Sequence, residues 1–124
     1  MSERGIQVDV QTEYVEAQSS PEEERYVFAY TITIKNVDLP PSQLLNRHWI
    51  ITNGQGEVEE VRGEGVVGKQ PKLASGEAFE YTSGAILKTP VGSMQGSYEF
   101  ANEAGARFNV EIPAFSLSVP NLVH

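Results

Sequence analysis

The chain has 124 residues, no cysteine and a formal net charge of −8 at pH 7. This length suits a single domain spanning residues 1–124, and the lack of cysteine excludes disulfides, thiolate metal sites and thiol nucleophiles. The acidic balance disfavours binding to nucleic acid or anionic lipid, because their phosphates are repelled at long range. The N-terminal segment lacks the apolar core of a secretory signal, and no apolar run approaches the ~20 residues of a membrane span, so we expect a cytoplasmic protein.

Strict alternation of apolar and polar residues predicts two strands in the first third of the chain. In residues 6–16, Ile6, Val8 and Val10 share one face, and the polar residues between them share the other. Residues 25–36 repeat this period of two with aromatic and β-branched side chains, which favour a pleated surface.

Turn residues divide the rest of the chain into further short strands. We expect strands near residues 44–52, 57–62, 77–83, 97–101, 107–112 and 115–119, with a short apolar piece at 85–89. No window of helical length has a 3.6-residue stripe. Seven to nine strands at this spacing predict an all-β, antiparallel sandwich of the immunoglobulin or fibronectin type III kind. Trp49 is expected in its core, and Tyr98 is placed like the tyrosine corner of such folds.

A glycine motif, Gly63-x-Gly65-x-x-Gly68, opens the most glycine-rich part of the chain. This spacing cradles pyrophosphate in dinucleotide enzymes, where a strand precedes the motif and a helix follows it. Here two valines and then Pro71 follow, so no helix is expected. The favoured interpretation is that the glycines form turns in an ordered loop.

Anion binding at the same loop is the alternative interpretation. Backbone amides of a glycine loop can form an anion nest, and nearby cations would add charge. The candidate anion-binding residues are Arg62, Gly63, Gly65, Gly68, Lys69 and Lys72. The ligand would be pyrophosphate or a dinucleotide polyphosphate, held weakly.

Six motifs, in the same order, resemble those of the bacterial ApaG family. They are YVFAYTITI at 26–34, LLNRHW at 44–49, GEGVVGKQP at 63–71, FEYTSG at 79–84, GSMQGSY at 92–98 and IPAFSL at 112–117. The resemblance implies a fibronectin type III-like sandwich and a gene neighbourhood with a diadenosine tetraphosphate hydrolase. It also implies a link to cobalt and magnesium tolerance, from which the name CorD comes, and a protein-binding role suggested by eukaryotic fusions.

Residues for metal binding or catalysis are sparse. His48 and His124 are the only histidines, and His48 has no further ligand at a useful spacing. Glu57, Glu59 and Glu60 are expected to be solvated on a hairpin rather than to hold a cation. No Gly-x-Ser-x-Gly nucleophile elbow is present. We therefore expect no metal, no cofactor and no enzymatic activity.

A strand at the edge of a sheet is the remaining candidate site, because an open edge can accept a strand from a partner protein. The final strand is a candidate, with Phe115, Leu117 and Val119 as partner-binding residues, and the first strand is another. Pro113 is expected to bend the chain just before the final strand. Ordinary closure of the domain's own edge is the alternative. The sequence thus favours a protein-binding module with an unidentified partner.

Overall fold

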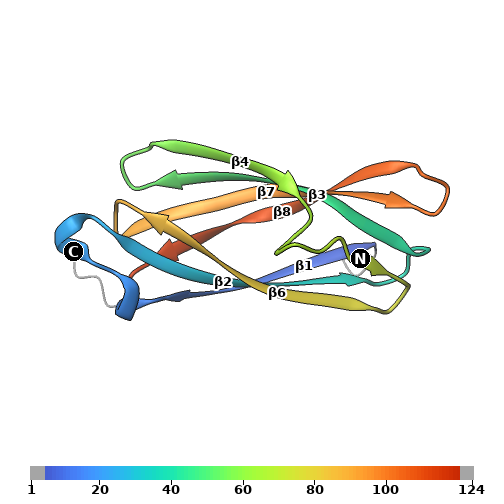
Figure 1. Cartoon of the computed structure of the whole chain (residues 1–124), viewed down its shortest axis with the longest axis horizontal. Helices are drawn as coiled ribbons and strands as arrows, with labels where there is room; N and C mark the ends of the chain where they lie inside the picture. The colour runs from blue at the N-terminus through green and yellow to red at the C-terminus, as the bar shows by residue number, and fades with distance from the viewer. Residues whose placement is uncertain (1–4, 121–124) are drawn as a thin grey trace.

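The computed structural model describes residues 5–120, so His124 lies outside the described part of the chain. Two antiparallel sheets pack face to face, as the alternation predicted (Figure 1). The smaller sheet has the order β1-β2-β6, and the larger has the order β4-β3-β7-β8, with β5 beside β3. No helix among residues 5–120 is long and apolar enough to cross a membrane.

The strands and two short 3₁₀ turns have the following bounds. The smaller sheet contains β1 (Ile6–Tyr14), β2 (Tyr26–Asn36) and β6 (Ala78–Leu87). The larger contains β3 (Ser42–Asn53), β4 (Val58–Glu64), β5 (Lys72–Leu73), β7 (Val91–Asn102) and β8 (Arg107–Ser118). The 3₁₀ turns η1 (Glu16–Gln18) and η2 (Pro21–Glu23) connect β1 to β2.

The last three long strands are continuous where the sequence predicted breaks. Gly84 lies within β6 and pairs with Ala29, so residues 77–83 and 85–89 belong largely to one strand. Gly96 lies within β7, where a Cβ atom would overlap the His48 carbonyl of β3. Pro113 lies within β8 at a register shift, because an edge strand with a bulge tolerates a residue without an N–H. Glycine and proline are ordinarily signals of a turn. Here Gly96 allows two strands to approach closely, and Pro113 lies at a bulge.

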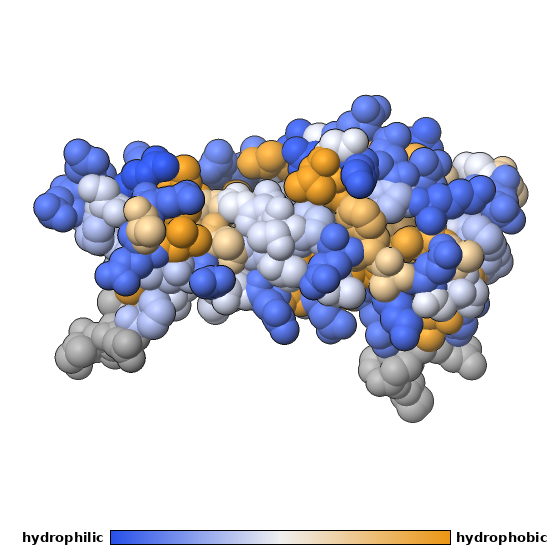
Figure 2. Space-filling model, turned by 60° about the horizontal axis from the view of Figure 1, so that its bottom comes forward, coloured by the Kyte–Doolittle hydropathy of each residue, from blue (hydrophilic) through white to orange (hydrophobic). Residues whose placement is uncertain are grey.

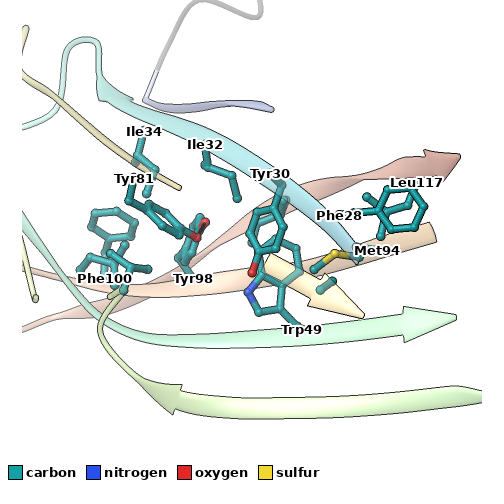
Figure 3. Close-up of a cluster of buried hydrophobic side chains, with 14 of the residues drawn as sticks. Phe28, Tyr30, Ile32, Ile34, Trp49, Tyr81, Met94, Tyr98, Phe100 and Leu117 are labelled. Carbon is teal, nitrogen blue, oxygen red and sulfur yellow. Dashed lines mark hydrogen bonds between the residues drawn. The ribbon is translucent and has the colours of Figure 1, made fainter. Parts of the chain in front are cut away.

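Trp49 lies at the centre of the core, as predicted, and is 3% exposed. Its indole meets Tyr30 of the opposite sheet with ring centroids 5.5 Å apart and an edge-on geometry (Figure 3). Tyr98 and Phe115 also meet it edge-on, at 6.4 and 5.9 Å. Such pairs stabilise by ≈ 0.5–1.5 kcal/mol beyond area burial, so Trp49 ties both sheets together.

Tyr98 takes a different role from the predicted tyrosine corner. It lies inside β7, fully buried, and its hydroxyl bonds the Tyr81 hydroxyl of β6 at 2.5 Å rather than a nearby backbone group (Figure 3). The bond connects the two sheets through the core, because β6 and β7 belong to different sheets. Each hydroxyl therefore satisfies the other where water is excluded.

Replacing either tyrosine tests this inter-sheet bond. Tyr98→Phe should lower the free energy of unfolding by about 1–2 kcal/mol, because the buried Tyr81 hydroxyl loses its partner. The double variant Tyr81→Phe/Tyr98→Phe should lose less than the sum of the single variants. Urea unfolding at constant m-value measures all three. Strictly additive losses would show that the two hydroxyls do not interact.

Candidate functional site

The glycine loop, residues 63–72, runs from the end of β4 to β5 and contains no helix after Gly68. Val66 and Lys69 exchange two backbone hydrogen bonds of 2.8 and 2.9 Å, so Val67 and Gly68 form a two-residue turn. Both have positive φ, 43° and 81°, as a type I′ hairpin turn requires. The expectation that this segment joins two β elements is confirmed.

Three backbone amides of the glycine loop donate to protein carbonyls. Gly65 N–H donates to the Leu45 carbonyl at 2.8 Å, and the Val66 and Lys69 amides make the paired bonds of the turn. Gly65 itself has a φ of 66°, and a Cβ atom there would overlap the Lys69 carbonyl. An anion nest needs unengaged N–H groups. This geometry supports the interpretation that the glycines are required for the turn.

The cations predicted around the loop are largely paired with acids. Arg62 lies 3.5 Å from Glu60 on its own strand, and Lys72 lies 3.7 Å from Glu103 in the turn after β7. Exposed pairs such as these contribute little stability, but they reduce the local positive charge. Lys69 forms no ion pair among the described residues. The local excess of positive charge is therefore smaller than the sequence indicated.

Arg47 is the cation of this region that the sequence analysis did not select. Its guanidinium donates to the Glu64 and Gly65 carbonyls at 3.1 and 2.9 Å. It also covers Gly63, where a Cβ atom would come within 2.8 Å of it. Arg47 therefore fixes the start of the glycine loop. Arg47 is two residues before Trp49 on β3, so the two side chains share a face of the strand, and this spacing predicts that Arg47 faces the core.

The same guanidinium acts on the tyrosines between the sheets. Burial raises the pKa of Tyr30, Tyr81 and Tyr98 above the ordinary value, and the positive charge of Arg47 opposes this increase only in part. A tyrosine with a raised pKa stays neutral at physiological pH. These hydroxyls therefore serve as hydrogen-bonding groups of the core rather than as bases.

A hollow of about 610 Å³ lies on the outer face of the larger sheet. Its lining includes Asn46, His48, Arg62, Glu64, Ser97, Glu99 and Asn109. Two of its lining side chains are hydrogen-bonded to each other, since Asn46 donates to Glu99 at 2.7 Å, and a third, His48, lies 3.3 Å from Glu60 on β4. His48 thus lies in a sheet and is hydrogen-bonded.

No group of three histidine, aspartate or glutamate residues within residues 5–120 is arranged to hold a metal ion. The carboxylates of Glu57, Glu59 and Glu60 in the β3–β4 hairpin do not converge on one point. Glu59 and Glu60 are adjacent on β4, so their side chains point to opposite faces of the strand. Glu57 instead accepts a hydrogen bond from the Asn53 amide at 2.7 Å.

The three predicted partner-binding residues lie at the predicted edge but face the core. β8 pairs with β7 on one side and ends the larger sheet. Leu117 is fully buried, and Phe115 packs against Tyr30 and Trp49. Val119 packs against the same core. A partner at this edge would therefore meet the backbone and the outward polar side chains of β8 rather than Phe115 and Leu117.

Comparison with known sequences identifies close relatives. A family model described as the ApaG domain matches residues 16–102. Proteins called "Protein ApaG" from Citrobacter koseri and Salmonella arizonae are each 58% identical over 117 residues, which cover 94% of this chain and 94% of theirs.

Solved structures agree with the fold. A structure titled as the putative ApaA protein from Bordetella pertussis is 50% identical, with a TM-score of 0.92, over 96% of this chain and 98% of that one. A protein from Archaeoglobus fulgidus matches with a TM-score of 0.53 at 9% identity, covering 95% of this chain and all of that one. That second likeness concerns the fold alone.

Two alanine substitutions separate the roles of the loop glycines. Gly65→Ala should lower the free energy of unfolding by about 3 kcal/mol, because a left-handed residue is strained and its Cβ meets a carbonyl. Gly68→Ala is the matched control: its φ is also positive, but the space beside it is open, so about 1 kcal/mol should be lost. Thermal or urea unfolding measures both, and equal losses would contradict the predicted crowding at Gly65.

A substitution of Val67 should stabilise the domain, because a β-branched residue is strained at a φ of 43°. Val67→Asn should raise the free energy of unfolding by about 1 kcal/mol, since Asn-Gly suits a type I′ turn. Val67→Thr keeps the β-branch and adds polarity, so it should bring no gain. A gain from Thr equal to that from Asn would assign the effect to the exposed apolar surface instead.

Proposed function

This chain belongs to the ApaG family, and from that premise we propose that it is a cytoplasmic, non-enzymatic module that binds another protein. The observation that carries the proposal is that each sheet ends in strands with one unpaired edge. β1 and β6 end the smaller sheet, β4 and β8 end the larger, and each pairs with a single strand among the described residues. Edge strands present unpaired backbone groups that a partner strand can use.

The interior of the domain supports the same proposal. Every buried side-chain polar atom in the described part of the chain has a hydrogen-bond partner. The large aromatic side chains lie in the core or pack against it. The hollow of about 610 Å³ is on an outer sheet face, and Asn46 and Glu99 in its lining are hydrogen-bonded to each other. Such an arrangement favours recognition at the surface over chemistry in a pocket.

A weak anion site at the glycine loop is the second candidate. It rests on Lys69, whose ammonium has no acidic partner among residues 5–120. The ligand would be pyrophosphate or a dinucleotide polyphosphate, in keeping with the gene neighbourhood that the family resemblance implies. The engaged amides of Gly65, Val66 and Lys69 weigh against it. We propose that the family's link to cobalt and magnesium acts through the protein partner.

One pair of experiments separates the two candidates. Affinity capture from native lysate with the tagged domain should recover a discrete partner, and amide NMR titration with pyrophosphate should leave Gly65, Gly68 and Lys69 unshifted. Lys69→Gln is the matched control for charge and should not change either result. Saturable loop shifts that Lys69→Gln and added salt abolish, with no partner recovered, would replace the proposal with the anion site.

A further inference from the structure

Apart from the two-residue strand β5, four described strands have a free edge, and three of these carry features that discourage strand addition. β4 holds Glu59, Glu60, Arg62 and Glu64 among its seven residues. β8 holds Pro113 at a register shift, and β1 carries Asp9 and Glu13. Charges, proline and bulges are the features that natural edges use against unwanted pairing.

β6 is the edge that lacks this protection. Its ten residues, Ala78–Leu87, include Glu80 as their one charged residue and no proline. Its register with β2 runs without a shift from Lys35 opposite Ala78 to Tyr26 opposite Leu87. Within the described residues, β6 pairs with β2 and with no other strand. A long, regular and nearly uncharged edge is a template for another strand.

A cleft with both apolar and charged lining residues lies beside the end of β6. It has a volume of about 280 Å³, lies between β6 and β4, and is lined on its apolar side by Ile51, Val58, Ile86 and Leu87. Val58 is 61% exposed and Ile86 is 54% exposed, and both rank among the few large hydrophobic residues exposed in the described chain. Figure 1 shows β6 ending near the β3–β4 hairpin, which agrees with this lining.

Surface colouring indicates that such apolar areas are local. On the face shown in Figure 2, apolar areas are small and separated by polar side chains. Because polar residues share its lining, the cleft beside β6 offers one apolar anchor next to a strand edge rather than a broad apolar surface.

Charge around the cleft indicates the chemistry of the partner. Glu57 and Glu59 stand on the β4 side, and Lys88 stands at the end of β6. The whole chain carries a net charge of −8. A second copy would bring the same acids against this rim, whereas a basic segment would complement it.

We propose that the outer edge of β6 pairs with an extended segment of a partner protein in which basic and β-branched apolar residues alternate. One apolar side chain of this segment fills the cleft lined by Val58 and Ile86, and the positive charge of the segment complements Glu57 and Glu59 in the same lining. This inference rests on the proposed protein-binding function and gives it a location and a ligand class. It also moves the binding edge from β8 to β6.

A seven-residue peptide of alternating lysine and valine, capped at both ends, is the probe. Amide NMR should show saturable shifts along β6 and at residues 57–59, with slower hydrogen exchange on β6. Ile86→Lys should weaken binding roughly tenfold or more, because it removes the anchor contact and adds repulsion. Val67→Lys is the matched control: Val67 is also 54% exposed but belongs to the glycine loop, so affinity should not change.

Several results would overturn the inference. Shifts scattered over the acidic surface, equal weakening by Val67→Lys, or equal binding of a peptide N-methylated at alternate residues would show simple charge attraction without strand pairing. Dimerisation of the domain through β6 would identify a second copy as the occupant. The native spectrum and melting temperature of Ile86→Lys establish that the variant is folded.

Capture from lysate separates this inference from the function on which it rests. If Ile86→Lys still retains the partner that the native domain captures, β6 is not the binding edge, while protein binding stands. If the native domain captures no discrete partner, the protein-binding function fails, whether or not the peptide binds.

Discussion

The inward packing of aromatic side chains between two sheets is the constraint on which the rest of this structure depends. Trp49 and Tyr98 from one sheet meet Tyr30 and Tyr81 from the other, through ring contacts and a hydroxyl pair. Because these side chains fill the space between the sheets, little room remains there for a ligand. The outside of the domain then offers sheet faces, strand edges and loops. We propose that a partner is recognised at the strand edges.

Arg47 connects this core to the most conspicuous motif of the chain. Its guanidinium donates to carbonyls at the start of the glycine loop, and its positive charge acts on Tyr30, Tyr81 and Tyr98 of the core. Gly63 leaves room for the guanidinium, and Gly65 leaves room for the turn. The motif that resembles a phosphate cradle is therefore explained by packing and backbone geometry. A glycine pattern alone does not distinguish a ligand's close approach from that of the protein's own atoms.

Much of the fold follows from the sequence, because strand alternation and turn residues act locally. The first two strands, the core position of Trp49 and the absence of a helix after Gly68 were all predictable in this way. The continuity of β7 was not, since Gly96 reads as a turn until the neighbouring His48 carbonyl is seen. The role of Arg47 was missed because an arginine within a strand is ordinarily assigned to the solvent face.

The candidate site was less predictable than the fold, since it depends on which strands become edges. Strand order is a long-range property, and nothing near Ile86 in the sequence places it beside Val58. The alternating pattern of the final strand was correctly expected. The same alternation places the Leu117 side chain in the core, where a partner cannot contact it. Protection of an edge by charge can be judged only after the order β1-β2-β6 is known.

The central claim is that this domain works through an open strand edge rather than through its glycine loop. Amide-resolved hydrogen exchange, measured on the domain alone and bound to the protein recovered with it, tests this claim most directly. The account predicts slower exchange along residues 78–87 and unchanged exchange at residues 65–69. Protection confined to residues 65–69, with β6 exchanging as in the free domain, would contradict it.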